Sequence, residues 1–222
     1  MFRDREEAGR RLAARLARYK GRETVVFALP RGGVPVAAPI AAMLHAPLDL
    51  VLARKIGTPG QPELAMGAVA DGGTPVVVRN DEVIAMAGVD EAEFGAACRR
   101  ELKEIERRRR LYLGARERCE AEGRVAIVVD DGVATGATTR AALRAVRARR
   151  PKTLVLAVPV APPDALEALK GEADETICLE VHAAFGAIGY FYADFHQLGD
   201  DEVIAILESF APGAKEPKGS AG

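Results

Sequence analysis

Tryptophan is absent from this 222-residue sequence, and cysteine and serine are scarce, with three and two residues respectively. The cysteines Cys98, Cys119 and Cys178 have neither a metal-ligand spacing nor a C-x-x-C spacing. We therefore expect reduced thiols and a cytoplasmic protein. The two serines, Ser209 and Ser220, lie near the C-terminus, and no G-x-S-x-G motif is present. The absence of that motif excludes a serine hydrolase.

The sequence also lacks an excess of charge and a long apolar run. Lysine and arginine total 31 against 32 acidic residues, so no overall field attracts nucleic acid or an anionic membrane. No stretch approaches the 18 apolar residues of a membrane span, and the charged residues 1–11 do not resemble a signal peptide. The arginine run 107–110 lies among six glutamates in residues 101–122. This mixture predicts a solvated helix with ion pairs and no nucleic-acid partner.

What remains is an ordinary globular composition, 49% hydrophobic and 28% charged, arranged as alternating strand and helix patterns. The central strands are uninterrupted apolar runs, which is typical of strands buried on both faces. The sequence therefore predicts an α/β fold with a central, mainly parallel sheet and helices on both of its faces. We expect one domain over residues 1–210, followed by a disordered tail at 211–222. We expect strands near 24–29, 49–53, 124–129, 154–160 and 176–181, helices near 4–19, 34–44, 90–122, 138–149 and 164–170, and a hairpin over 67–78.

The loop after the strand at 124–129 carries the most specific pattern in the chain. Asp130 and Asp131 end the strand, and a glycine- and threonine-rich loop then opens a helix. Such a loop directs backbone N–H groups at one point and can bind a phosphate, while adjacent carboxylates suit the hydroxyls of a sugar. Gly132 and Gly136 enclose only three residues and no lysine follows, so the loop is not a P-loop. No G-x-G-x-x-G motif is present either.

This stretch closely resembles the phosphoribosyl-pyrophosphate signature of the type I phosphoribosyltransferases. The resemblance implies that Asp130 and Asp131 are catalytic and face the ribose hydroxyls. It also implies a central sheet with a small hood and a mobile hairpin loop. The residues that the resemblance assigns to the 5'-phosphate are Ala134, Thr135, Gly136, Ala137, Thr138 and Thr139.

Two further loops fit the same family. Arg31, Gly32 and Gly33 follow the first strand, where the family keeps a short pyrophosphate-binding loop. Glycine lets backbone N–H groups approach an anion closely, and an arginine guanidinium can donate two hydrogen bonds to a phosphate. By the same resemblance, we predict a cis peptide bond between Pro30 and Arg31.

The segment from Arg54 to Gly60 is similar to the start of the mobile catalytic loop of adenine phosphoribosyltransferases. We expect Arg54 and Lys55 to lead into a flexible loop that closes over pyrophosphate, with Lys55 contacting it.

Five of the eleven aromatic residues lie between positions 185 and 195. This cluster resembles the hood of 6-oxopurine phosphoribosyltransferases, which would span about residues 178–200 here. The resemblance implies that Phe191 and Tyr192 bind the base and that Asp194 helps to order Mg²⁺. The 6-oxopurine enzymes carry an aspartate where this chain has Ala134, whereas the adenine enzymes carry alanine there. The acceptor therefore stays open, as does the acid/base residue among His45, His182 and His196.

Together these resemblances imply a Mg²⁺-dependent phosphoribosyltransferase of nucleotide salvage. It would transfer the phosphoribosyl group from phosphoribosyl pyrophosphate to a small nitrogenous base, purines being favoured, and release pyrophosphate. A non-catalytic sensor of phosphoribosyl pyrophosphate or a nucleotide on the same fold is the alternative, and the cations Arg54 and Lys55 favour the enzyme. A hydrolase with Asp130 as nucleophile would not need the threonine-rich loop. The sequence leaves the oligomeric state open, a homodimer included.

Overall fold

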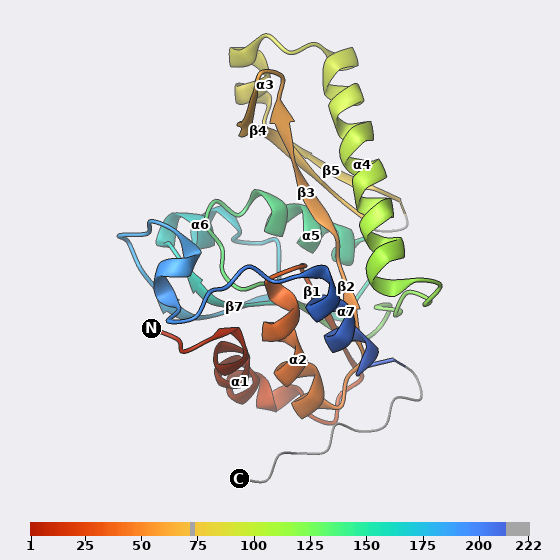
Figure 1. Ribbon diagram of the computed structural model, residues 1–222, viewed down its shortest axis with the longest axis vertical. Helices are drawn as coiled ribbons and strands as arrows, with labels where there is room; N and C mark the ends of the chain where they lie inside the picture. Colours follow the sequence, from red (N-terminus) through yellow and green to blue (C-terminus); the bar gives the residue numbers. More distant parts are fainter. Residues whose placement is uncertain (72–73, 212–222) are drawn as a thin grey trace.

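A five-stranded parallel sheet forms the centre of the protein, in the order β2-β1-β6-β7-β8 (Figure 1). The computed structural model describes residues 1–71 and 74–211. The parallel sheet that the apolar runs predict is thereby confirmed. Its strands are β1 (Thr24–Ala28), β2 (Leu48–Leu50), β6 (Val125–Val129), β7 (Thr153–Ala161) and β8 (Glu175–Val181).

Helices cover both faces of this sheet, as predicted (Figure 1). In β6, Ile127 and Val129 point into the core under α1 and α2, whereas Ala126 and Val128 point into the core under α5. Because the strand is buried on both faces, its residues can all be apolar and do not alternate between polar and apolar. The helices of the first face are α1 (Arg5–Leu16), α2 (Gly33–Leu44) and α7 (Asp200–Glu208), and those of the second are α5 (Ala137–Arg147) and α6 (Pro163–Ala168).

A second, antiparallel sheet, β3-β4-β5, rises from the edge of the central sheet and packs against α4 (Figure 1). We call residues 53–113 the arm. The arm is larger than the hairpin that the sequence predicts, and Arg54 and Lys55 lie in strand β3 where a flexible loop was expected. The predicted pairing of the hairpin is confirmed by β4 and β5, although residues 72–73 of its turn lie outside the described residues. The arm consists of β3 (Ala53–Thr58), β4 (Gln61–Ala70), β5 (Val76–Arg79), α3 (Asp81–Ala87) and α4 (Glu91–Leu113).

Helices α3 and α7 are absent from the sequence-based prediction because both are short and bury little. In α3 only Ile84 is buried, and in α7 only Val203 and Leu207. Helix α4 ends nine residues before the predicted boundary of 122, because Gly114 follows it with φ of +55°. Of the predicted tail, all but Ala211 lies outside the described residues. Among the helices that the structure describes, none combines the length and apolarity needed to cross a bilayer.

The base of the arm is fixed by Asp71, which is buried. Its Oδ1 accepts a hydrogen bond from the Leu52 N–H at 2.8 Å. Its Oδ2 lies 2.9 Å from Nη1 of Arg109 in α4 and 3.2 Å from Nη1 of Arg118. One carboxylate therefore joins both ends of the β3–β4 hairpin to the long helix.

Substitution Asp71→Ala is expected to lower the free energy of unfolding by about 3 kcal/mol, because the mostly buried Arg109 loses its counter-charge. Urea denaturation followed by circular dichroism measures the change. Asp81→Ala is the control, because the Asp81 carboxylate is 80% exposed in its pair with Arg79 and contributes little. Equal midpoints for the two variants would contradict this role for Asp71.

Candidate active site

The candidate site lies at the carboxyl ends of the central strands, where the loops after β1 and β6 meet. The loop after β6 runs from Asp130 to Gly136, and α5 begins at Ala137. Gly136 adopts φ of +79°, which a residue with a side chain rarely takes, and so turns the chain into the helix. Val133 N–H bonds to the Val160 carbonyl at 2.9 Å and anchors the loop to the end of β7.

The backbone N–H groups of residues 134–139 are free to bind a ligand. Within the part of the chain that the structure describes, none of them donates a hydrogen bond. Three of them belong to the first turn of α5, where the helix dipole favours a negative charge. Thr135 is exposed and Thr138 half-buried, so their hydroxyls are accessible, whereas Thr139 is buried. This geometry is that of an anion site at a helix N-terminus.

Asp131 is held by Arg5, a residue that the sequence analysis missed. Arg5 Nε lies 2.8 Å from Asp131 Oδ2, and both side chains are nearly buried. The same guanidinium donates to the His196 carbonyl at 3.0 Å and stacks over the Phe195 ring, 3.7 Å from its centroid. The Tyr192 hydroxyl donates to the Asp131 carbonyl at 2.6 Å. Asp131 is therefore an anchor for the loop as well as a candidate ligand.

The loop after β1 packs directly against these acids. A Cβ atom on Gly32 would lie 1.9 Å from Asp131 Oδ2, and one on Gly33 would lie 2.6 Å from the Val129 carbonyl oxygen. Only glycine lets the two loops approach so closely. The predicted cis peptide bond between Pro30 and Arg31 is confirmed. The Arg31 guanidinium is about one-third exposed and lies 3.9 Å from Asp200 of α7.

Asp130 presents the second carboxylate. It is half-buried, and its Oδ1 accepts a hydrogen bond from the Asp131 N–H at 2.9 Å. Burial, and then the neighbouring Asp131, raise the pKa of Asp130 well above its usual range. Burial also raises the pKa of Asp131, although Arg5 opposes this. A cation or a hydroxyl donor that approaches the two carboxylates therefore stabilises their charged form.

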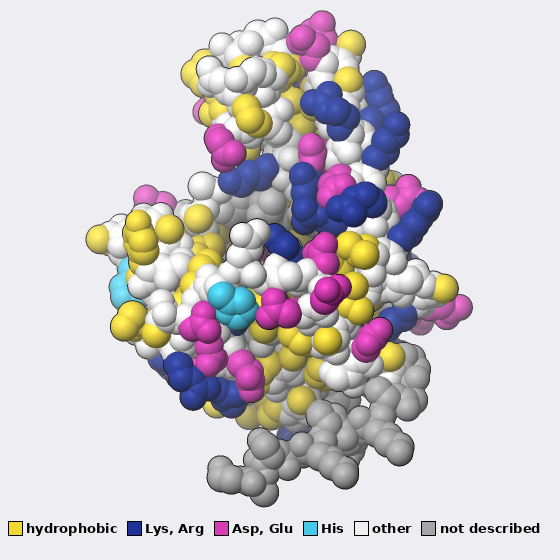
Figure 2. Space-filling view, viewed as in Figure 1, with side chains coloured by type: hydrophobic (Ala, Val, Ile, Leu, Met, Phe, Trp, Pro, Cys, Tyr) yellow, Lys and Arg dark blue, Asp and Glu magenta, His cyan; other side chains and the backbone are white. Residues whose placement is uncertain are grey.

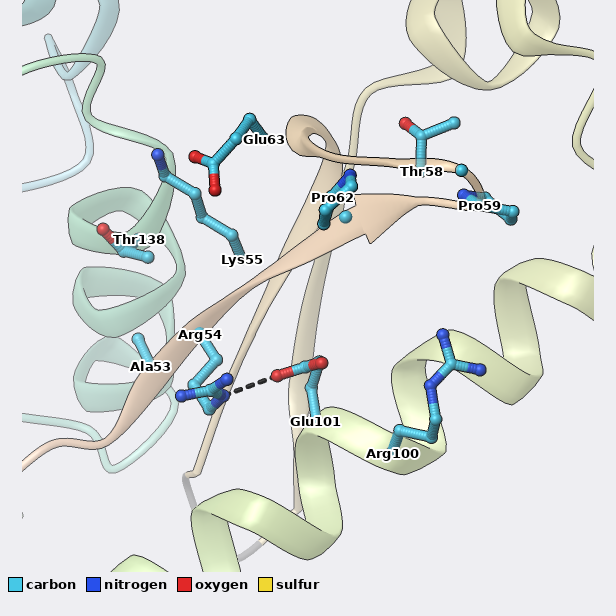
Figure 3. A pocket seen from close by; sticks show the side chains of 12 residues that line it. Ala53, Arg54, Lys55, Thr58, Pro59, Pro62, Glu63, Arg100, Glu101 and Thr138 are labelled. Carbon is cyan, nitrogen blue, oxygen red and sulfur yellow. Dashed lines mark hydrogen bonds and ion pairs between the residues drawn. The ribbon is translucent and has the colours of Figure 1, made fainter.

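Strand β3 brings Lys55 to the start of α5 (Figure 3). Lys55 is exposed, and it lines a cavity of about 620 Å³ together with Thr138. Its neighbour Arg54 is instead paired with Glu101 of α4 at 2.5 Å. In Figure 3 the Lys55 side chain runs toward α5, whereas Arg100 points toward the tip of the arm. The arm thus brings a cation to the anion loop from a strand.

We call residues 182–199 the hood. Phe191 is half-buried and stacks on His182 and Phe185, with ring centroids 4.7 and 5.0 Å apart. The sequence analysis predicts that Tyr192 binds the base. In the structure Tyr192 is buried between Phe2 and Phe195 and supports the Asp131 loop. Phe185 faces solvent-accessible space instead, in a cavity of about 460 Å³.

Asp194 is exposed, and its Oδ1 accepts a hydrogen bond from the His196 N–H at 3.0 Å. This bond and the His196 ring lower the pKa of Asp194. Over residues 1–71 and 74–211, no three His, Cys, Asp or Glu side chains form a metal-binding group, at Asp194 or elsewhere. Mg²⁺ commonly needs only one or two carboxylates when a substrate phosphate supplies the other ligands.

The three candidate acid/base histidines are spread out. His45 caps the end of α2 opposite to Gly33, so it lies a full helix length from the loops. His182 Nε2 lies 3.3 Å from Glu180. His196 lies between Glu202 and Asp194. The hydrogen bond to Glu202 raises the pKa of His196 most, and the one to Asp194 raises it further.

A signal for Arg5 exists in the sequence, although not in any motif. Arg5 shares the buried stripe of α1 with Ala8, Leu12 and Leu16, at helical spacing. An arginine on an apolar stripe must find a buried acid or stack on a ring. Its partner is 126 positions away, so local patterns do not identify it.

Substitution Arg5→Met is expected to lower the free energy of unfolding by about 3 kcal/mol at neutral pH, because Asp131 stays buried without its partner. Without the guanidinium the pKa of Asp131 rises further, so the deficit should shrink as the pH falls and the carboxyl is neutralised. Urea denaturation at several pH values measures this. Arg10→Met, on the exposed face of α1, is the control. A pH-independent deficit would contradict the assignment.

Comparisons with known proteins agree on one family. The family profile described as "Phosphoribosyl transferase domain" matches residues 3–195. The "Putative phosphoribosyl transferase" of two Mycobacterium tuberculosis strains is 47% identical over 208 residues, which are 94% of this chain and 46% of the relative. The chain thus spans about half the length of these curated relatives. The crystal structure of TT1426 from Thermus thermophilus is 42% identical, with a TM-score of 0.81, and the match covers 96% of this chain and 100% of TT1426.

Proposed function

Since the chain belongs to the phosphoribosyl transferase domain family, we propose that it transfers the 5-phosphoribosyl group of phosphoribosyl pyrophosphate to a nitrogenous base and releases pyrophosphate. The observation that carries this proposal is the set of free N–H groups at 134–139, directly after two acids at the end of the central strand. An anion site beside a carboxylate pair matches a sugar phosphate.

Each loop has a distinct part in this proposal. The N–H groups and hydroxyls of the loop from Ala134 to Thr139 bind the 5'-phosphate. Asp130 accepts hydrogen bonds from the ribose hydroxyls, and Asp131, fixed by Arg5, keeps the loop in place. Arg31, with the Gly32 N–H group beside it, and Lys55 from the arm face the pyrophosphate. The Gly33 N–H, which the sequence analysis included, donates to the Leu29 carbonyl at 2.9 Å instead.

The residues present fit Mg²⁺ as an ion carried by the substrate. Asp130 would hold it, because this carboxylate lies next to the proposed ribose site and adjoins a second carboxylate, Asp131. When bound, Mg²⁺ neutralises negative charge on the pyrophosphate.

The reaction needs orientation and charge stabilisation more than a protein nucleophile. The bond between ribose C1 and the pyrophosphate oxygen breaks, the acceptor nitrogen forms its bond to C1 from the opposite face, and the proton of that nitrogen leaves to solvent. The departing oxygen gains negative charge, which Lys55 and Arg31 stabilise, while C1 becomes electron-poor. Fixed loops on a rigid sheet supply the alignment.

The direct test incubates the protein with Mg²⁺, phosphoribosyl pyrophosphate and a panel of bases, purines first, and measures pyrophosphate. We expect release that requires both Mg²⁺ and a base. Binding of phosphoribosyl pyrophosphate without release for any base would contradict the enzyme and support the sensor. Phosphate release without pyrophosphate would identify a hydrolase.

Substitution Lys55→Met is expected to lower kcat/KM for phosphoribosyl pyrophosphate by about 10²-fold, because the departing pyrophosphate loses one charge-stabilising donor. Steady-state assays measure the change. The matched control is Lys103→Met, which removes an exposed lysine from α4. Wild-type kinetics for the Lys55 variant would remove the arm from the proposed mechanism.

A further inference from the structure

The arginine run 107–110 lies in the last turns of α4, which runs down the arm beside β3 and β4 (Figure 1). Figure 2 shows Lys and Arg side chains along the arm, with Asp and Glu side chains among them. Each arginine of the run has a carboxylate within ion-pair distance, namely Glu104 for Arg107 and Arg108, Asp71 for Arg109, and Glu106 for Arg110. The run is therefore neutralised by partners within the arm and at its base.

Two arginines from other segments add their charge at the base of the arm. Arg118, which follows α4, lies 3.2 Å from Asp71 Oδ2, the atom that Arg109 already contacts. Arg149 follows α5, and burial lowers the pKa of its guanidinium. The charges of Asp71 and Asp49 oppose this shift, whereas those of Arg118 and Arg109 add to it. The three arginines and the two aspartates therefore form one group of interacting charges.

Donors in this group lack hydrogen-bond partners among the residues that the structure describes. The Nε, Nη1 and Nη2 atoms of Arg149 are all buried and unpartnered. The guanidinium lies over the Phe27 ring, 5.1 Å from its centroid, which replaces only part of the lost hydration. Arg109 Nη2 is also buried and unpartnered, because only Nη1 of Arg109 reaches Asp71. Buried donors are normally satisfied, and an ion or a water molecule can do this where the protein does not.

The carboxylates of the group are already engaged. Asp49 accepts a backbone N–H at each of its two oxygens, both at 2.8 Å. Asp71 accepts a backbone N–H at Oδ1 and faces two of the arginines with Oδ2. The nearby Glu106 is paired with Arg110. With this pair included, the group contains four guanidinium groups and three carboxylates, so one positive charge within it is uncompensated.

A cavity of about 200 Å³, which we call the arm-base cavity, opens at this group. Its described lining consists of Asp71, Pro75, Leu102, Ile105, Glu106, Arg109 and Arg118. The Arg118 side chain is 37% exposed, so its guanidinium is accessible to a ligand. Sites for cofactors and drug-sized molecules measure about 300–1,000 Å³, so this smaller space suits an ion. The cavity shares no described lining residue with the three cavities at the phosphate loop.

We propose that the arm-base cavity binds a small inorganic oxyanion of the phosphate type. Arg118 donates to the ion and Arg109 Nη2 is the second donor, because a guanidinium matches the oxygens of a tetrahedral anion. Arg149 does not line the cavity and attracts the ion through its uncompensated charge. The bound ion ties α4 to the segment that follows it and so stabilises the base of the arm. This site goes beyond the proposed phosphoribosyl transfer and does not depend on it.

The test follows urea denaturation in phosphate and in chloride at equal ionic strength. Phosphate should raise the midpoint more than chloride, because an ion that binds the folded state stabilises it. Phosphate can also bind the loop at 134–139, so the readout is a comparison of variants. Arg118→Met should weaken phosphate binding in the arm-base cavity about 10- to 100-fold, the value of hydrogen bonds to a charged group, and so reduce the phosphate-dependent shift. Arg99→Met, which removes an exposed arginine of α4 outside the cavity, is the matched control and should keep the wild-type shift.

A second measurement locates the ion in the wild-type protein. Crystals soaked in selenate, the probe for a tetrahedral oxyanion, should show an anomalous peak between Arg109 and Arg118. This measurement does not depend on the folding of any variant.

Three results would overturn the site. The first is an equal phosphate-dependent shift in Arg118→Met and Arg99→Met, and the second is an equal effect of chloride and phosphate on the wild type. The third is selenate bound at 134–139 alone. A selenate peak in the cavity without the solution effect marks an adventitious ion only and also counts against the site. All of these results leave the proposed transfer intact, and a failure of the transfer assay leaves the oxyanion site intact.

Discussion

The ion pair between Arg5 and Asp131 holds the candidate site together. Through it, the first helix, the loop at the end of the central strand and the hood are joined at one carboxylate, 2.8 Å from the guanidinium. Gly32 allows the loop after β1 to approach the same carboxylate without a clash. A buried pair of this kind is costly to break, so it fixes the position of the neighbouring N–H groups. The anion loop can therefore keep its donors unpaired because its ends are tied elsewhere.

Around this fixed centre the protein separates two chemical environments. The arm, built from an antiparallel sheet and a long helix, carries cations to one side of the loop. The hood covers the other side with stacked aromatic rings. The ion pairs at Asp71 hold the arm at its place on the central sheet.

The sequence predicted the parallel sheet and its main helices because long apolar runs and helical spacing are local signals. It also singled out the loop from Asp130 to Thr139, because a dense motif lies within a few residues. It did not predict that Lys55 lies in a strand, since the β3–β4 segment is rich in glycine and proline and reads as a loop. The pairing of Arg5 and the burial of Tyr192 depend on contacts between distant segments, which no local pattern contains.

The central claim is that the main-chain N–H groups of residues 134–139 bind a phosphate. The most direct measurement is a titration of ¹⁵N-labelled protein with ribose 5-phosphate, followed residue by residue through the amide resonances. The account predicts saturable shifts that are largest at Thr135, Gly136, Ala137 and Thr138, with a matching response when phosphoribosyl pyrophosphate replaces the sugar phosphate. Saturable binding that leaves these amides unmoved and shifts resonances elsewhere would contradict it.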